Sequence, residues 1–146
     1  MLRLYETQHL LPLTMIDNNI LIAFANRNVL VTGGTGMIGR QIVNILCDAG
    51  ANVTSASLDD ISVHSSAQHL RVDLTDFQLC KDITQGMDYV FHVAGIKGSI
   101  EVTKSKPASF FVPLLMMNTN MLEAARINEV AKVSKPGIFP ISMFGI

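Results

Sequence analysis

A glycine-rich turn that follows a short apolar run constrains this chain more than any other feature. Residues 28–32 read Asn-Val-Leu-Val-Thr, and the turn at 32–39 carries glycines at positions 33, 34, 36 and 39. A β-branched run without polar alternation predicts a buried parallel strand. Residues 36–49 have helical apolar spacing, which predicts a helix closed by Gly50. The apolar face expected for this helix carries Ile38, Ile42, Ile45, Leu46 and Ala49.

The glycines have the spacing of a dinucleotide-binding turn. Those at 33, 36 and 39 satisfy G-x-x-G-x-x-G, and those at 34, 36 and 39 satisfy G-x-G-x-x-G. Glycines let the backbone approach a pyrophosphate, which the free N–H groups of a helix start can bind without a cationic side chain. The alternative is a turn that uses glycine for its shape alone. The residues expected to bind in this turn are Gly33, Thr35, Gly36, Met37, Ile38 and Gly39.

Alternating strands and helices continue along the chain. Such alternation predicts an α/β fold with right-handed crossovers, here an incomplete Rossmann-like doubly wound parallel sheet of about four to five strands with flanking helices. Strands are expected at 51–57, 70–73 and 88–94, and helices at 76–85 and 107–130. Residues 1–27 are interpreted as a lead-in with one short helix on the edge of the domain. Residues 28–146 are expected to form the dinucleotide-binding domain.

Prolines complicate the last third of the chain. Pro113 would interrupt or kink the long helix unless the helix begins there. The fifth strand is expected within residues 134–142, where Pro136 and Pro140 conflict with a central strand. We therefore expect an ill-formed fifth strand, with exposed apolar surface where later strands and helices would pack.

Composition limits the classes of partner. A chain of 146 residues with 49% hydrophobic residues can bury a core, and a net charge of −1 gives no reason to expect nucleic acid or an anionic membrane. Pro12 and Asp17 interrupt the apolar stretch at 10–24, which argues against a membrane span and a secretory signal and favours a cytoplasmic location. Cys47 and Cys80 lack metal-binding spacing, so we expect reduced thiols and no metal.

The cofactor can be NAD or NADP. Ser57, at the expected end of the second strand, stands where an acidic residue usually binds the adenosine ribose. A neutral residue there would not repel a 2′-phosphate, which leans toward NADP, although no arginine follows closely. Asp59 and Asp60 lie just beyond and are alternative ribose ligands.

Three motifs in order give a family resemblance. The turn at 32–39, the pair Asp73-Leu74 and the run His-Val-Ala-Gly at 92–95 resemble the extended short-chain dehydrogenase/reductases, the NAD-dependent epimerase/dehydratases of nucleotide sugars. The resemblance implies that Asp73 accepts the exocyclic amine of adenine and that Leu74 forms part of the adenine wall. The alternative for Asp73 is a turn cap before Thr75.

The same resemblance places Ala94 and Gly95 under the ribose on the nicotinamide side of the cofactor. His92 is expected to pack in the sheet rather than to catalyse. The motifs at 97–98 and 106–110 are similar to a subgroup near the GDP-fucose synthases. The helix around 114–130 would form a homodimer contact, with apolar positions at Leu114, Leu115, Met117, Met121, Leu122 and Ala125.

The end of the chain departs from the family pattern. Catalysis in the family uses a Ser or Thr with a Tyr-x-x-x-Lys pair, whereas neither Tyr5 nor Tyr89 has a lysine four residues later. Ser142 is the candidate for the catalytic serine, although the prolines before it spoil the match. Pro113-Leu114 also stands where the family often has asparagine.

These observations predict the NAD(P)-binding portion of a nucleotide-sugar epimerase/dehydratase-like oxidoreductase, without turnover on its own. Its full-length relatives would take a nucleotide sugar as substrate. The alternatives are a non-catalytic NAD(P)-binding sensor or partner subunit, and a non-functional fragment. Thermal unfolding with each dinucleotide distinguishes a chain that binds NAD(P) from one that does not.

Overall fold

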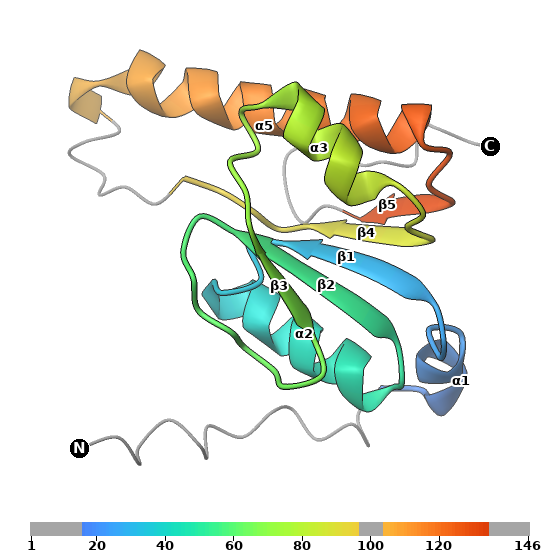
Figure 1. Ribbon diagram of the computed structural model, residues 1–146. Coiled ribbons are helices and arrows are strands. Elements are labelled where there is room, and N and C mark those ends of the chain that lie inside the picture. Colours follow the sequence, from blue (N-terminus) through green and yellow to red (C-terminus); the bar gives the residue numbers. More distant parts are fainter. Residues whose placement is uncertain (1–15, 97–103, 135–146) are drawn as a thin grey trace, which may run out of the picture.

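Five parallel strands form the centre of the molecule, with helices on both faces (Figure 1). The computed structural model describes residues 16–96 and 104–134. The strands are β1 (Asn28–Thr32), β2 (Asn52–Ser57), β3 (Gln68–Arg71), β4 (Tyr89–His92) and β5 (Lys132–Ser134). The helices are α1 (Asn18–Ile22), α2 (Met37–Asp48), α3 (Phe77–Thr84) and α5 (Pro107–Ile127). This confirms the predicted α/β, Rossmann-like fold class.

The order of the strands creates a switch point beside the glycine turn. The sheet runs β3-β2-β1-β4-β5, and every neighbouring pair is parallel. The chain therefore adds β2 and β3 on one side of β1, and then crosses back to add β4 and β5 on the other side. Thr32, the last residue of β1, pairs in register with His92, the last residue of β4. In open α/β sheets, ligands bind outside the carboxyl ends of the strands at this kind of reversal.

The two faces of the sheet have separate cores. Figure 1 shows α3 and α5 on one face and α2 on the other. Leu30 and Val90 face α3 and α5, where they share a core cluster with Met117 and Met121. Val29, Val31, Val43, Leu46, Ala51 and Val53 form the cluster on the α2 face. Strand β1 is thus buried on both faces, as its continuous apolar run predicts.

Helix α2 buries only part of the face that the sequence predicts, since Leu46 is buried and Ile42 packs against the core. Its buried residues are Gly39, Val43 and Leu46, whereas Ile38 is 54% exposed. The rotation of the helix follows from Gly39, which packs against the backbone of the glycine turn and brings the residues four and seven positions later onto the same face. Gly50 ends the helix with a φ of +80°, as the sequence predicts.

Helix α5 corrects the interpretation of Pro113. The helix begins with Pro107 in its first turn and continues through Pro113 to Ile127, which is three residues short of the expected end. Met117, Met121 and Ala125 are buried as core residues, whereas Leu115 and Leu122 are exposed. The sequence therefore predicted the helix correctly but not its tolerance of an internal proline.

Two strands begin earlier than predicted. Strand β5 occupies Lys132–Ser134, before the prolines, and the rest of the expected span at 134–142 lies outside the described residues. Pairing with β4 selects this earlier segment because Val133 then enters the core beside α5. Strand β3 is shifted by two residues, to Gln68–Arg71. Prolines thus follow β5 rather than interrupt it.

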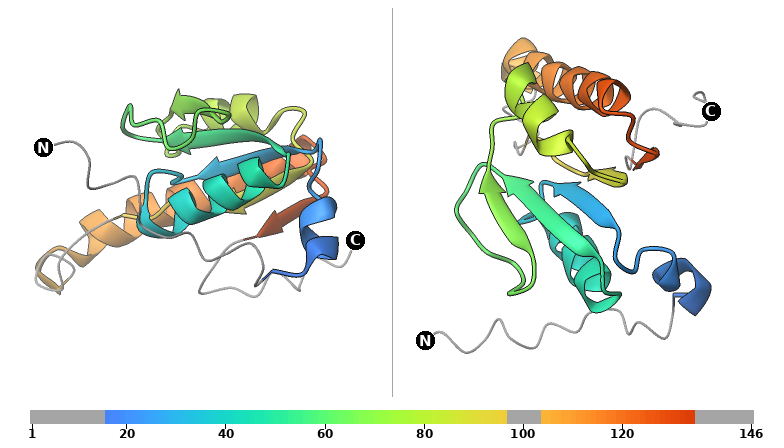
Figure 2. Two further views of the ribbon diagram at one scale, coloured as in Figure 1. Left: turned by 90° about the horizontal axis from the view of Figure 1, so that it is seen from below. Right: turned by 45° about the vertical axis from the view of Figure 1, so that its right-hand side comes forward.

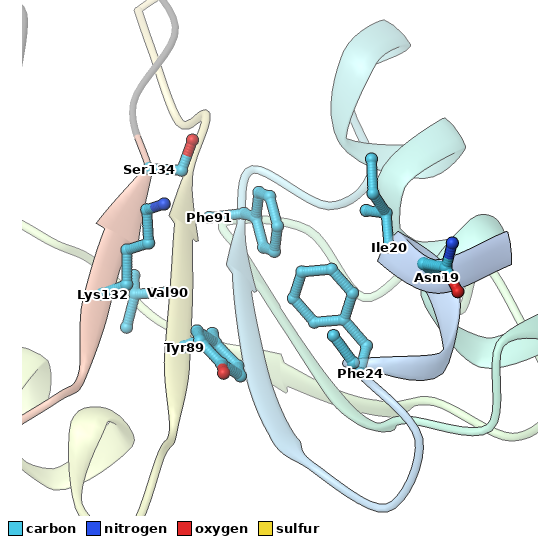
Figure 3. A pocket seen from close by; sticks show the side chains of 9 residues that line it. Asn19, Ile20, Phe24, Tyr89, Val90, Phe91, Lys132 and Ser134 are labelled. Atoms are coloured by element: carbon cyan, nitrogen blue, oxygen red, sulfur yellow. The ribbon is translucent and has the colours of Figure 1, made fainter. Parts of the chain in front are cut away.

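An open apolar groove lies where β4 and β5 meet α1 (Figure 3). The left view of Figure 2, from below, shows α2 and α1 on this side of the sheet. Phe24, just after α1, packs edge-on against Tyr89 with ring centroids 5.2 Å apart and lies 5.8 Å from Phe91. The groove is lined by Asn19, Ile20, Ala23, Phe24, Tyr89, Val90, Phe91, Lys132 and Ser134. Accessible apolar surface is therefore present at this edge.

Candidate functional site

The glycine turn is closed by backbone hydrogen bonds. Gly33 has a φ of +69°, a conformation that side chains disfavour, and its N–H donates to the carbonyl of Ala56 on β2 at 2.7 Å. The N–H of Gly36 donates to the carbonyl of Gly33 at 2.9 Å. The turn is thereby anchored to β2 and folded back on itself.

Two glycines permit backbone contacts that no other residue would allow. A Cβ at Gly39 would lie 2.1 Å from the carbonyl oxygen of Gly33 and 2.8 Å from Cα of Gly34. A Cβ at Gly33 would lie 2.7 Å from Cα of Ala94, at the end of β4. These contacts hold the start of α2 and the end of β4 tightly against the turn. This close approach is the structural basis of the dinucleotide-binding spacing.

The start of α2 presents uncapped N–H groups beside the turn. Gly36 is the N-cap residue, and no side chain there accepts a hydrogen bond from the helix. The first N–H groups of a helix have no partner within it, and the helix dipole favours an anion at this end. The side chains of Met37 and Ile38 are 82% and 54% exposed, so they lie away from the core. The arrangement suits a phosphate bound by backbone groups.

The end of β2 is connected to the turn through Thr35. The Thr35 hydroxyl donates to Oδ2 of Asp59 at 2.8 Å and lies 3.2 Å from the Ser57 hydroxyl. The Thr35 N–H also donates to the Ser57 hydroxyl at 3.3 Å. Ser57 is buried, whereas Asp59 is exposed. Asp60 is exposed as well and pairs with Arg71 at 3.2 Å, so the carboxylate that contacts the turn is that of Asp59.

The Asp73-Leu74 pair lies on the loop after β3. Oδ1 of Asp73 accepts hydrogen bonds from the N–H of Thr75 at 2.9 Å and its hydroxyl at 2.8 Å, so Asp73 does cap this turn. The Leu74 side chain is 5% exposed and packs in the core. Asn120 of α5 donates to the carbonyls of Leu74 and Thr75 at 3.1 and 2.9 Å. Helix α5 therefore holds this loop in place.

The end of β4 meets the glycine turn from the other side. Ala94 is half-buried against Gly33, and Gly95 is exposed with open space around its Cα. His92 is 1% exposed and hydrogen-bonds to both Thr32 and Asn118, which fits a residue packed in the sheet. The carboxyl ends of β1, β2 and β4 thus bring together the glycine turn, Ser57 and Ala94, while the Asp73-Leu74 pair follows β3.

Sequence reasoning missed two side chains at this edge. Arg40 donates from Nη2 to the carbonyl of Thr35 at 2.8 Å, which places a guanidinium beside the turn. The sequence signal that could have indicated Arg40 is its position directly after Gly39. Asn118 was missed because its significance depends on the distance between α5 and β4, which no local pattern encodes.

A buried thiol lies below the Asp73 loop. Burial, together with the nearby charges of Asp76 and Asp73, raises the pKa of Cys80 to about 11. Its Sγ donates to the carbonyl of Leu74 at 3.3 Å. This thiol stays protonated at neutral pH and has a structural role.

The described residues 16–96 and 104–134 contain no group of three His, Cys, Asp or Glu side chains that could hold a metal ion. None of their helices is long and apolar enough to cross a membrane. Ser142 lies outside the described residues. None of the residues that line the apolar groove belongs to the predicted site, so the candidate site is the carboxyl edge of the sheet.

Comparison with known proteins gives the family. The sequence pattern of the NAD dependent epimerase/dehydratase family matches residues 29–137. The chain belongs to this family. A UDP-glucose 4-epimerase of Rickettsia bellii is 27% identical, and the match covers 84% of this chain and 41% of that relative. The chain therefore spans well under half the length of this epimerase.

Solved structures of family members share the fold. An epimerase of Methanothermobacter thermautotrophicus superposes with a TM-score of 0.73 at 26% identity, covering 85% of this chain and 38% of the other. The UDP-glucose 4-epimerase of Thermus thermophilus, solved in complex with NAD, has a TM-score of 0.64 at 31% identity, covering 73% of this chain and 36% of the other. The subgroup near the GDP-fucose synthases stays a prediction.

Proposed function

We propose that this chain binds NAD across the carboxyl ends of β1, β2 and β4, as the cofactor-binding portion of a nucleotide-sugar epimerase. The observation that carries the proposal is the contact of Gly39 with the turn, where a Cβ would lie 2.1 Å from the Gly33 carbonyl oxygen. This contact places the uncapped start of α2 beside the switch point between β1 and β4. Backbone N–H groups there would hold the pyrophosphate.

Asp59 favours NAD over NADP. Its carboxylate is fixed by the Thr35 hydroxyl and by the N–H of Ile61, which donates to Oδ1 at 3.1 Å. A fixed carboxylate accepts hydrogen bonds from a ribose diol and repels a 2′-phosphate. Ser57, whose lack of charge gives the lean toward NADP in the sequence, is buried, and its hydroxyl is bonded to Thr35. Two cations could still favour NADP: Arg40 beside the turn, and Arg71, which pairs in register with Ser57.

The other two motifs would bind the adenine and the ribose on the nicotinamide side of the cofactor. Both hydrogen bonds to Asp73 within the described chain use Oδ1, which leaves Oδ2 to accept from the exocyclic amine of adenine. Leu74 would contribute through its backbone, because its side chain is in the core. Ala94 and Gly95 would lie under the ribose on the nicotinamide side.

We expect binding without turnover in this chain. NAD, when bound, supplies hydride transfer to or from a sugar carbon. The 146 residues contain no Tyr-x-x-x-Lys pair to exchange the accompanying proton. A nucleotide sugar and a cytoplasmic location are therefore proposed for a protein of the full family length.

Thermal unfolding with and without NAD tests the proposal. A ligand at about 100 times its Kd stabilises the folded state by about 2.7 kcal/mol. Gly36→Ala is the informative variant, because its Cβ would meet only the Gly33 carbonyl oxygen at 3.1 Å and would stand where the phosphates bind. We expect this variant to fold and to lose the stabilisation by NAD.

The matched control is Gly50→Ala, at the far end of α2. Gly50 has a positive φ with open space around it, so alanine should cost about 1 kcal/mol of stability. NAD should still stabilise this variant as it stabilises the parent chain. A cooperative transition of the parent chain that NAD does not move would exclude the binding function, as expected of a non-functional fragment.

Asp59→Asn tests the choice of cofactor. Removing the charge should weaken NAD binding by about tenfold, the loss of roughly one charge-assisted hydrogen bond, while NADP binding is unchanged or improved. Thr35→Ser, which keeps the hydroxyl, is the control for disturbance of the turn. Tighter binding of NADP than of NAD by the unaltered chain would reverse the assignment.

A homodimer through α5 remains part of the proposal. Apolar side chains on this helix stay accessible in the monomer: Phe111, Val112, Leu115, Met116 and Leu122. A contiguous apolar stripe on a helix is typical of a protein contact. Sedimentation equilibrium of the chain measures the association directly.

A further inference from the structure

A chain of hydrogen bonds connects α5 with the carboxyl ends of β1 and β4; it is buried between Thr32 and His92 and partly buried at Asn118. Nδ1 of His92 lies 2.7 Å from the Thr32 hydroxyl, and Nε2 lies 2.9 Å from Oδ1 of Asn118 on α5. Thr32 is 0% exposed and His92 is 1% exposed. The bond between Thr32 and His92 therefore constrains the geometry strongly, because water cannot replace a partner lost there.

The acceptor at Asn118 fixes the positions of the protons. Oδ1 cannot donate, so Nε2 of His92 must carry the proton and donate to it. Nδ1 is then an acceptor, and the Thr32 hydroxyl donates to it. The Thr32 oxygen in turn accepts from the N–H of Ala94 at 3.4 Å. Each group therefore donates to the next one in the chain: Ala94 to Thr32, Thr32 to His92, and His92 to Asn118.

The Ala94 end of this chain touches the glycine turn. The N–H of Val93 donates to the carbonyl of Thr32 at 3.2 Å, and Ala94 packs where a Cβ on Gly33 would lie 2.7 Å from its Cα. Thr32 itself is followed directly by Gly33. A displacement of Thr32 or of Ala94 would therefore be transmitted to the backbone that binds pyrophosphate.

We propose that the chain Thr32–His92–Asn118 is a positioning device through which α5 sets the geometry of the cofactor site. The inference rests on the proposed function, since it assigns positioning residues for NAD binding at the same site. Thr32 and His92 are the terminal residues of β1 and β4 on either side of the switch point. Their hydrogen bond ties the two strand ends together at the position where the dinucleotide would cross the sheet.

The experiment combines NAD titration with a direct measurement of the His92 tautomer. In the intact chain, the ¹⁵N chemical shifts of the imidazole should report Nε2–H and an accepting Nδ1. Thr32→Val keeps the side-chain shape and removes the hydroxyl, and Asn118→Leu removes the acceptor. Each should weaken NAD binding about five- to tenfold, as expected for the loss of one intramolecular hydrogen bond. Asn118→Leu should also convert His92 toward the other tautomer.

Two variants separate positioning from stability. Thr32→Ser keeps the hydroxyl and should bind NAD within about twofold of the parent. Asn128 ends α5 and donates to the carbonyl of Lys81 at 2.8 Å and to the hydroxyl of Thr84 at 2.7 Å, far from the turn. Asn128→Ala should lower the melting temperature and leave the affinity for NAD unchanged.

Equal NAD affinity in the parent, Thr32→Val and Asn118→Leu would overturn the positioning role and leave the proposed function intact. An Nδ1–H tautomer in the parent chain would overturn the hydrogen-bond chain itself. Absence of NAD binding by the parent would overturn the proposed function and the positioning role together, while the tautomer would still establish or exclude the network.

Discussion

Strand β4 has two faces that differ in how completely they are covered. Val90 and His92 point toward α5 and are almost fully buried. Tyr89 and Phe91 point toward α1 and stay half-buried beside the open groove (Figure 3). On β5 the contrast continues, because Val133 packs in the core while Lys132 and Ser134 line the groove.

The contrast shows which part of the molecule carries the site. The covered face contains the hydrogen-bond chain from α5 to Thr32 and the asparagine that holds the Asp73 loop. The open face contains one short helix and an aromatic cluster. Cofactor binding should therefore depend on side chains of the α5 face and be insensitive to changes in the groove.

The largest expected difference is between core truncations on the two faces. Met121→Ala removes a fully buried side chain on α5 and should lower the free energy of unfolding by about 3 kcal/mol. Phe24→Ala in the groove should cost about 1 kcal/mol, because the ring is only half-buried. Urea denaturation of both variants measures the difference. Equal losses would mean that the α1 face is as completely packed as the α5 face.

A pH titration probes the covered face through Cys80. The unfolded thiol has an ordinary pKa of 9.0, whereas the folded thiol has a pKa of about 11. Between these values the unfolded state binds fewer protons, so stability falls as the pH rises, by about 2 kcal/mol at pH 11. Cys80→Ala should lack this component of the slope. An unchanged slope in that variant would show that the thiol is not desolvated.

The smallest expected effect on stability is at the outer surface of α5. Leu115 is 51% exposed, so Leu115→Glu should change the free energy of unfolding by less than about 0.5 kcal/mol. The same change should weaken self-association if α5 forms the dimer contact. Sedimentation of the variant and of the matched polar change Leu115→Gln measures this, and unaltered association in both would exclude α5 as the contact.

The sequence predicted the elements whose signals are local. Strand β1 was found because an apolar run marks it, and α2 was found, at Met37–Asp48 against the predicted 36–49, because glycines mark its ends. The buried face of α2 was predicted only in part, at Leu46 and Ile42. Gly39 and Val43 were missed because the contact between Gly39 and the turn, rather than the distribution of isoleucines, determines the orientation of the helix. The apolar pattern of a helix does not reveal which of its residues must pack against the backbone of another segment.

The candidate site was predicted in the same uneven way. Glycine spacing indicated the turn, and the assignments of Asp73 and Ala94 came from a family resemblance. The pairing of Thr35 with Asp59 and of His92 with Asn118 joins residues 24 and 26 positions apart, so it depends on how strands and helix pack. The position of β5 was predicted wrongly because three residues carry only a weak local preference for strand structure. Pairing with β4 determines where this strand lies.

The most direct test of the account is to follow the backbone amide signals of the ¹⁵N-labelled chain during titration with NAD. We expect saturable shifts at Thr35, Gly36, Met37 and Ala94, with the signals of α1 and β5 unchanged. Such a pattern would place the dinucleotide at the carboxyl ends of β1 and β4. Shifts confined to Phe24, Tyr89 and Phe91, or none at millimolar NAD, would contradict the central claim.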